Sequence, residues 1–353
     1  MGERILKIIQ AGIRAPSGDN CQPWRFEVEG DRIDLFNLPE RDTSLYNYKQ
    51  RASLVAHGAC IENMSIAASN FGFKAGITYF PIPEDQDHVA RLKLVNGEIT
   101  GDPLFSFVSE RTINRKRYKP ENLSPEAMDC IRQTTLNSDI QGCSFRLLLG
   151  SEKETAAEIV ALNDRLVFEN AYLHRFLFEH IRWTLAEAER TKDGLDIRTL
   201  ELAPQDRMIF PLLKSFCLVS LIGMFGATKM IAANAKNLLL SASSAGIITI
   251  QDTSCESWIN AGRLLERAWL EATRQHLSFH LMTGMTLMVQ RVRDGVVDGL
   301  TGRNISLIKR AELLLREVAG LESEVALLFR VGKAEPPSAT SFRRDYDDCT
   351  NRY

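Results

Sequence analysis

The stretch RAPSGDNCQPWRF (Arg14–Phe26) lies between two segments with different hydrophobic periodicities. Before it, apolar residues recur with helical spacing over residues 3–14. After it, they alternate over residues 24–37, around a turn at 29–31 that contains a glycine. The first pattern predicts an amphipathic helix and the second predicts two paired strands. The stretch itself is rich in turn residues, so it either only connects the helix to the strand or also forms a binding loop.

The residue types in this stretch suit the edge of a flat ligand. Pro16 fixes φ and lacks an N–H, and Gly18 lets the backbone approach a flat partner closely. Ser17, Asn20 and Gln22 supply side-chain donors and acceptors. Together they suit a heteroaromatic ring with several carbonyls and nitrogens. An Asx turn before a strand explains the same residues without a ligand, so the residues alone leave both interpretations open.

Composition excludes several classes of protein. The 353 residues could form one large domain or two ordinary ones, and the net charge of −2 gives no overall basic field for nucleic acid. The seven cysteines are scattered without a CxxC pair, which indicates neither a disulfide framework nor a zinc site. His276 and His280 have helical spacing but no nearby carboxylate or cysteine, so we expect no metal. The N-terminus lacks the apolar core of a signal peptide, and we expect a cytoplasmic protein.

The most apolar segment covers residues 209–233. Lys214 and Lys229 interrupt it and leave 14 uncharged residues between them, fewer than the ~18–20 that span a bilayer. This predicts a buried or lid helix and makes a membrane partner unlikely, with contact at a membrane surface as the alternative. The segment belongs to an apparent insertion over about 184–236, and insertions of this size are often lids or interface arms.

Two segments echo each other across the chain. AHGACIENMSIAAS (56–69) resembles NAGRLLERAWLEAT (260–273), and each keeps a Gly-x-x-x-Glu pattern before an apolar run. The glycines, Gly58 and Gly262, stand on otherwise bulky helix faces, where a backbone or a flat ligand could come close. The echo predicts an ancient tandem duplication, although any two buried helices can look alike. We expect a first half over 1–104 and a second over 105–353.

A basic cluster and the C-terminal tail are candidates for a phosphate site. Within ERTINRKRYKP, seven consecutive residues contain four cations and Asn114, and guanidinium groups bind phosphate through paired hydrogen bonds. The four cations are Arg111, Arg115, Lys116 and Arg117. A solvated basic turn is the alternative. Near the C-terminus a Pro-Pro loop precedes Arg343 and Arg344, which would complete a phosphate clamp if the tail packs back onto the cluster.

Other nucleotide-binding and hydrolytic signatures do not occur in the sequence. There is no GxGxxG after a strand and no GxxxxGK[ST], so the sequence lacks the motifs of Rossmann dinucleotide-binding sites and of P-loop nucleotide-binding sites. There is also no GxSxG to indicate acyl transfer.

Taken together, these segments resemble the FMN-dependent nitroreductase superfamily, and most closely its bacterial branch in which two degenerate units are fused in one chain. APSGxNxQPW is similar to the family's flavin-edge loop, RTINRKRY to its phosphate-binding opening R-R-[ST]-x-R, and SFRRDYDD to its C-terminal arginine segment. The chain departs from the family at Ile113, where Ser or Thr is usual. Thr112 stands beside it, so one hydroxyl contact is missing or displaced. The likeness covers most of both halves but not 184–236.

The resemblance implies an α+β nitroreductase-like fold of two fused units, each with a mostly antiparallel sheet packed by long central helices. It also implies an FMN-binding oxidoreductase that uses NAD(P)H for two-electron reduction of a small nitroaromatic or quinone-like acceptor. The flavin carries that chemistry, so no catalytic side chain is expected. The first alternative is a non-catalytic protein that binds or sequesters flavin under a lid. The second is an interaction or membrane-associated protein on a decayed scaffold.

The two halves contribute different parts of the expected flavin site. The loop occurs only in the first half and the arginine opening only in the second, which predicts one composite FMN site per chain. Such a pseudo-dimer could be a monomer or form a homodimer. The turn at Thr283 and Gly284 is the candidate backbone donor near flavin N5. The full set of expected cofactor-binding residues is Pro16, Ser17, Gly18, Asn20, Gln22, Arg111, Thr112, Asn114, Arg115, Thr283, Gly284, Arg343 and Arg344.

Overall fold

The first sheet is built from two hairpin-like strand pairs. In the computed structural model, which describes residues 2–320 and 323–350, its four antiparallel strands follow the order β1-β2-β4-β3. The strands are β1 (Trp24–Glu29), β2 (Arg32–Asn37), β3 (Phe73–Tyr79) and β4 (His88–Asn96). The first pair and β3 confirm the alternation in the sequence. The stretch 81–103, with PIPEDQD and GDP, predicts a charged connection from its sequence. That prediction is wrong for β4, which pairs with strands on both sides.

The second sheet has the order β5-β8-β10-β9 and is also antiparallel. Its strands are β5 (Cys143–Leu148), β8 (Ser244–Ile250), β9 (Ser278–Leu281) and β10 (Glu324–Gly332). β10 is buried along almost its whole length, as expected for a central strand covered on both faces. The α+β class with two largely antiparallel units is therefore confirmed.

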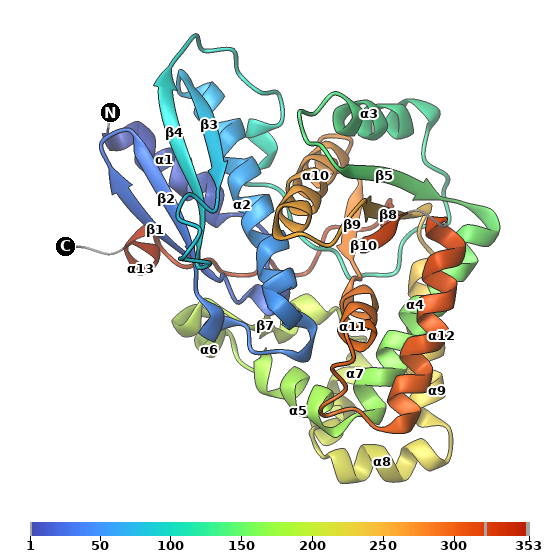
Figure 1. Ribbon diagram of the computed structural model, residues 1–353. Coiled ribbons are helices and arrows are strands. Elements are labelled where there is room, and N and C mark those ends of the chain that lie inside the picture. Colours follow the sequence, from blue (N-terminus) through green and yellow to red (C-terminus); the bar gives the residue numbers. More distant parts are fainter. Residues whose placement is uncertain (1, 321–322, 351–353) are drawn as a thin grey trace.

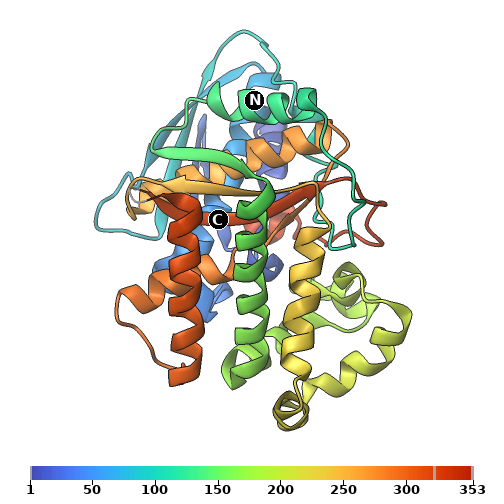
Figure 2. The ribbon, with the colours of Figure 1, turned by 90° about the vertical axis from the view of Figure 1, so that its right-hand side faces the viewer.

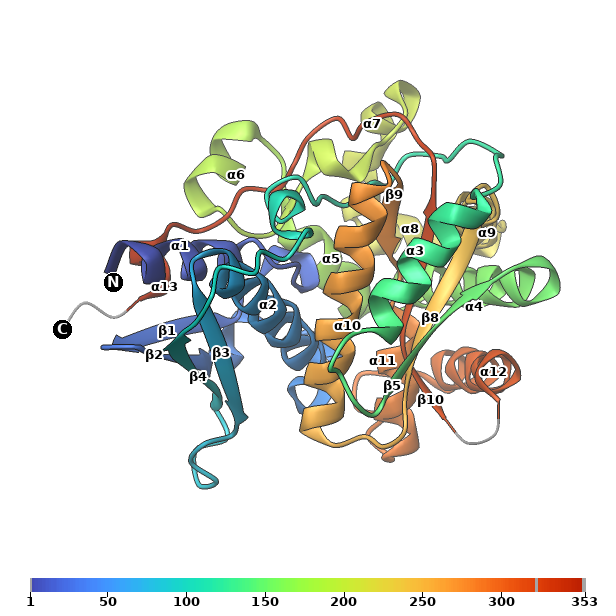
Figure 3. The ribbon, with the colours of Figure 1, turned by 90° about the horizontal axis from the view of Figure 1, so that it is seen from above.

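Two long helices lie side by side between the sheets, α2 (Arg51–Asn70) and α10 (Cys255–Arg274) (Figure 1, Figure 3). They cross at the two echoed glycines. A Cβ atom on Gly58 would lie 1.9 Å from the Ile259 carbonyl oxygen, and one on Gly262 would lie 2.0 Å from the Val55 carbonyl oxygen. Only glycine permits this approach, which confirms that a backbone comes close at both positions.

The remaining helices cover the outer faces. α1 (Gly2–Ile13) packs on α2, and α3 (Pro125–Leu136) packs on α10. The Ser124 hydroxyl accepts a hydrogen bond from the Ala127 amide and caps α3, as its Ser-Pro start predicts. Below the second sheet, α4, α9 and α12 lie side by side, and α11 packs against α12 (Figure 2). Their bounds are α4 (Gly150–Glu169), α9 (Ala227–Leu240), α11 (Gly284–Arg293) and α12 (Gly302–Ala319).

The segment that leads into α9 forms a small module with a core of its own. The module comprises α5 (Ala171–His180), β6 (Ile181–Arg182), α6 (Leu185–Thr191), β7 (Leu195–Asp196), α7 (Pro204–Ile209) and α8 (Phe216–Met224). Its buried centre includes Phe178, Ile181 and Val219. Among the described residues, no single helix has the length and apolar character to cross a membrane. One helix pair, Pro204–Lys214 with Phe216–Met224, meets those criteria jointly but is bent by 110°.

After β10 the chain returns to the first half of the molecule. Residues 333–350 run across the surface, and α13 (Tyr346–Cys349) packs against α1 and β1 (Figure 1). A bridge between Phe26 and Thr350 joins the tail to the edge of the first sheet. The tail therefore connects both halves and passes the loop that precedes β1.

Candidate functional site

Two adjoining cavities are lined by the loop before β1, the segment around Arg115 and the helix α10. The larger has a volume of about 400 Å³ and the smaller about 70 Å³. Six residues line both cavities, so the two form a continuous site. They are Pro16, Ser17, Asp19, Ile113, Arg115 and Trp269. The larger volume falls in the usual range for small-molecule sites, roughly 300–1,000 Å³.

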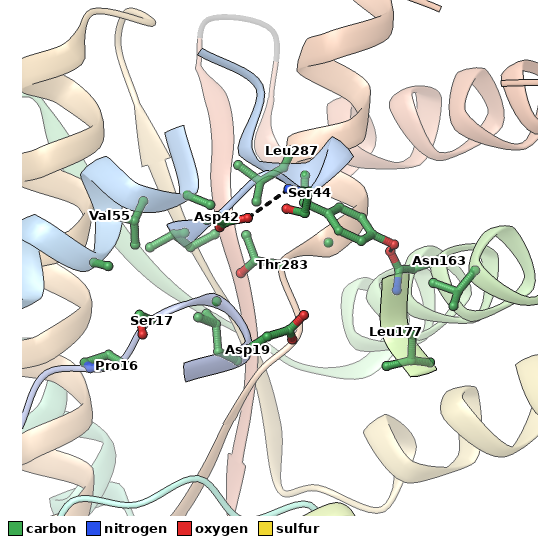
Figure 4. A pocket seen from close by; sticks show the side chains of 18 of the residues that line it. Pro16, Ser17, Asp19, Asp42, Ser44, Val55, Asn163, Leu177, Thr283 and Leu287 are labelled. Atoms are coloured by element: carbon green, nitrogen blue, oxygen red, sulfur yellow. Dashed lines mark hydrogen bonds between the residues drawn. The ribbon is translucent and has the colours of Figure 1, made fainter. Parts of the chain in front are cut away.

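The loop before β1 is held in an unusual backbone conformation. Asp19, Asn20 and Gln22 have positive φ angles of 44°, 56° and 50°, which non-glycine residues adopt only when the surroundings impose them. The Gln22 amide N–H donates to the Ser17 hydroxyl at 3.0 Å and closes the turn. The loop thereby presents Pro16, Ser17 and Asp19 to the larger cavity (Figure 4).

The walls of the larger cavity are mostly apolar and come from both halves. α2 supplies Ala52, Val55 and Ala56, and α10 supplies Leu265 and Trp269. Val55 contacts Gly262 at the crossing of α2 and α10, so the close helix contact at the glycines fixes how these two helices line the cavity.

The N-terminus of α11 forms another part of the same wall. Thr283 and Gly284 both line the larger cavity (Figure 4). A Cβ on Gly284 would lie 2.5 Å from Asn163 Oδ1 and 3.1 Å from the Tyr46 ring, so this corner leaves no space for a side chain at 284. Tyr46 donates a hydrogen bond to Asn163 Oδ1 at 3.3 Å. The Asn163 and Tyr46 side chains therefore lie directly against Gly284, which has no side chain of its own.

Four arginines surround the smaller cavity, together with Asn20, Thr112, Thr340 and Ser341. The arginines are Arg14, Arg111, Arg115 and Arg343. Within residues 2–320 and 323–350, the buried Nε atoms of Arg14 and Arg343 have no hydrogen-bond partner. Burial, and then the positive charges of Arg111 and Arg14, lower the pKa of Arg343 to about 9. Asp19 is the one acidic residue in this lining, so the cavity is a strongly electropositive site suited to an anion.

Arg111 also connects α10 to the start of the segment after α1. Its Nε lies 2.9 Å from Glu266 Oε1, and its guanidinium stacks 4.6 Å from the centre of the Trp269 ring. Arg111 also donates to the Arg14 carbonyl. Burial raises the pKa of Glu266, and the Arg111 charge opposes that rise. Arg111 therefore has a carboxylate counter-charge, whereas Arg343 has none at hydrogen-bond distance in the described chain.

Three of the expected binding residues line neither cavity. The side-chain amide of Gln22 donates through Nε2 to the Lys192 carbonyl at 2.6 Å, and its Oε1 accepts from the backbone N–H of Arg344 at 2.8 Å. Asn114 donates to Ser278 Oγ and the Glu335 carbonyl. Arg344 forms an ion pair with Asp193 at 2.8 Å. These side chains position the loop, the basic segment and the tail, while the other ten expected residues lie in the cavity linings.

The insertion lies beside the site, but it contributes little to the lining. Of residues 184–236, Leu195 is the one that lines either of these two cavities, and the Thr199 carbonyl accepts a hydrogen bond from Arg115 at 3.1 Å. The apolar wall on this side comes instead from α4 and α5, which include Phe168, Leu173 and Leu177. If a lid covers the larger cavity, α5 is the element placed to form it.

Sequence reasoning missed five polar residues that line the larger cavity. They are Asp19, Asp42, Tyr46, Asn163 and Asp164. Burial raises the pKa of all three carboxyl groups, and that of Asp164 rises to about 6. The Asn-Asp pair inside the apolar run of α4 was the available signal, because adjacent polar residues on a buried helix face need a partner or a ligand.

Asp164→Asn is expected to change the pH dependence of stability. Because burial raises the folded-state pKa of Asp164 to about 6, the wild-type protein binds an extra proton on folding and loses stability as pH rises from about 4 through 6. The asparagine variant avoids this cost and should gain roughly 1–3 kcal/mol at about pH 8, with no gain at about pH 4. Thermal melts at both pH values measure the difference. An equal effect at both would show that the Asp164 carboxyl does not titrate in this range.

Comparison with known proteins gives partial matches. No family model matches the chain. The uncharacterized protein MT1398 of Mycobacterium tuberculosis (strain CDC 1551 / Oshkosh) is 26% identical over 345 residues, which is 96% of this chain and 47% of that protein. The chain thus spans about half the length of this relative.

Shorter matches reach two proteins with functional names, both from the same strain of M. tuberculosis. The putative NAD(P)H nitroreductase MT3217 is 28% identical over 90 residues, which is 26% of each chain. The putative NAD(P)H nitroreductase acg is 32% identical over 88 residues, which is 25% of this chain and 27% of that one.

Solved structures show a weak likeness. The FMN-dependent nitroreductase NfnB from Mycobacterium smegmatis in complex with NADPH aligns over 70% of this chain and 96% of its own, with 12% identity and a TM-score of 0.40. A nitroreductase with bound FMN from Desulfitobacterium hafniense DCB-2 aligns over 71% and 99%, with 13% identity and a TM-score of 0.40. Similarity at this level adds no argument to the sequence matches. About a quarter of the chain is thus similar in sequence to proteins that carry the name putative NAD(P)H nitroreductase.

Proposed function

We propose that each chain binds one FMN and uses NAD(P)H to reduce a small acceptor of the nitroaromatic or quinone class. The observation that carries this proposal is the junction of an apolar cavity with an arginine-lined one, both bordered by the loop at Pro16 and Ser17. In the proposed division at 104/105, the first half supplies the loop and the second supplies Arg111, Arg115 and Arg343. One chain therefore contains one complete set.

The residues present fit the two ends of an FMN molecule. The buried Nε atoms of Arg14 and Arg343, which lack partners among the described residues, would hold the phosphate. Pro16 and Gly18 allow the loop backbone to lie against the ring edge. Thr283 and Gly284, which line the same larger cavity, would lie near the ring. Bound FMN would supply the two-electron chemistry.

The protein's own part in the reaction would be binding, orientation and exclusion of water. The apolar side chains of α2, α10 and α5 line most of the larger cavity, and water excluded from such a site cannot compete for reactive groups. The fixed guanidinium groups would hold the ligand in one orientation, because their hydrogen bonds to phosphate are directional. No lining side chain is required to act as acid or base.

Purified protein tests the proposal directly. After reconstitution with FMN and removal of excess, the visible flavin band should correspond to one FMN per chain. Anaerobic addition of NADH or NADPH should bleach the band, and a nitroaromatic or quinone should restore it. A protein that stays colourless after reconstitution would contradict the proposal.

A second function is favoured by the position of α5. Leu173, Phe176 and Leu177 of this helix line the larger cavity, so α5 could bury a bound ring and exclude a second substrate. The protein would then store or sequester flavin. Bound FMN that neither nicotinamide cofactor bleaches would support this alternative over the oxidoreductase.

A further inference from the structure

The outer surface of the module carries an apolar patch that nothing in the described chain covers. We call it the apolar tip and define it by residues on α7, α8, the 3-10 turn between them and the start of α9. Phe225 is 86% exposed, Met208 82%, and Met224 and Met230 75% each. Ile209, Leu212 and Leu221 complete the set and are also exposed. Exposed apolar side chains gathered in this way are typical of an interaction surface.

The module leaves most of the apolar surface of α8 exposed. Its sequence FCLVSLIGM is apolar on nearly every face, yet Val219 is its only buried residue. α7 and the turn after it have no buried residue. A helix that is apolar all round is normally enclosed by protein or lipid. We propose that the apolar tip docks on the surface of a membrane that contains anionic headgroups.

The charges of the tip are mainly positive, and Asp206 on α7 is the one acidic residue among its described elements. Residues 207–251 contain no Asp or Glu, and their four cations are Arg207, Lys214, Lys229 and Lys236. Lys229 is exposed and has no ion-pair partner in the part of the chain that the structure describes, whereas Lys236 pairs with Glu158. Lys214 lies 3.7 Å from the centre of the Trp183 ring. Cations beside exposed Phe, Leu and Met match the interface of an anionic bilayer, where apolar groups enter the acyl boundary and lysines contact headgroups.

The same charges disfavour a second copy of this chain as the occupant. A twofold contact through the tip would place the patch against itself and bring its cations together, and like charges across an interface oppose association. The 110° bend between the two short helices also fits a pair that lies along a surface rather than one that crosses it.

Flotation of the full-length protein with lipid vesicles tests the proposal. The protein should float with vesicles that contain phosphatidylglycerol at low salt and should bind less to pure phosphatidylcholine. The double variant Met224→Ser/Phe225→Ser should weaken this binding by at least about tenfold. Lys229→Gln should weaken it by about fivefold, since one cation near an anionic surface contributes about 1 kcal/mol.

Leu313→Ser is the matched control, because Leu313 is 68% exposed on α12, outside the module. It should bind vesicles like the wild type, and melting temperatures should show that all variants are folded. Three results would overturn the proposal. They are a wild type that ignores anionic vesicles, a double variant that still binds, and a solution dimer that the double variant dissociates.

Discussion

Gly262→Ala is expected to destabilise the protein by about 3 kcal/mol, with a fall in melting temperature of about 5 °C or more. A Cβ at this position would lie 2.0 Å from the Val55 carbonyl oxygen and 2.9 Å from Val55 Cα, both backbone atoms that no rotamer change can move. Alanine favours the isolated helix by about 1 kcal/mol, but the clash outweighs that gain. α2 and α10 must separate, and the core between the sheets opens with them.

Gly58→Ala should have a similar effect, because its Cβ would lie 1.9 Å from the Ile259 carbonyl oxygen on the other side of the crossing. Gly302→Ala is the control. Gly302 is also helical, but a Cβ there meets nothing within 4 Å, so this variant should melt like the wild type. If Gly262→Ala melted like Gly302→Ala, the helices would have to cross elsewhere.

The variant also tests how the crossing shapes the site. Val55 and Ala56 on α2 and Leu265 and Trp269 on α10 all line the larger cavity. Separation of the helices should therefore weaken ligand binding along with stability. Titration of FMN into folded Gly262→Ala at low temperature would measure that second effect.

Much of the fold was readable from the sequence because its signals are local. Apolar periodicity located α1, β1, β2 and α2, and the Ser-Pro pair located the start of α3. β4 was missed because the polar stretch PIPEDQD before it and a glycine after it suggested a loop. Its pairing with β2 and β3 depends on tertiary contacts that periodicity cannot show.

The site was readable in part for the same reason. The loop and the basic segment are continuous motifs, so their residues could be named, and the structure brings most of them to two adjoining cavities. Their orientations depend on segments far away in the chain. Gln22 and Arg344 bond to each other across 322 positions, and Asn163 meets Tyr46 across 117. No spacing rule within a segment could have indicated these pairs.

Arg343→Gln is expected to stabilise the ligand-free protein and to weaken FMN binding. Arg343 is held beside Arg111 and Arg14, and its buried Nε has no partner among the described residues. The pKa of Arg343 is lowered to about 9 in the folded state. Neutral pH lies below both the folded-state and the unfolded-state pKa, so Arg343 is charged in both states. The lowered pKa then means that the charge destabilises the folded state. Removing the charge should recover roughly 1–3 kcal/mol, since an uncompensated buried charge is costly. Melting of the apo variant measures this gain.

The same substitution should lower the affinity for FMN by between about 10- and 100-fold, because a hydrogen bond to a charged group contributes roughly 1.5–3 kcal/mol. Riboflavin carries the same ring without a phosphate, so its affinity should barely change. FMN should then raise the melting temperature of the wild type more than that of the variant. The order of stability would therefore reverse between the apo and FMN-saturated proteins.

Arg344→Gln is the matched control, since the adjacent side chain pairs with Asp193 at 2.8 Å and lines neither cavity. It should slightly destabilise the apo protein and leave the ratio of FMN to riboflavin affinity unchanged. If Arg343→Gln destabilised the apo protein as well, its charge would be compensated without a ligand. If both variants lowered FMN and riboflavin affinity equally, the phosphate would bind elsewhere. A reversal confined to Arg343 would instead identify its guanidinium, whose buried Nε has no partner among the described residues, as the group that makes this chain selective for a phosphorylated flavin.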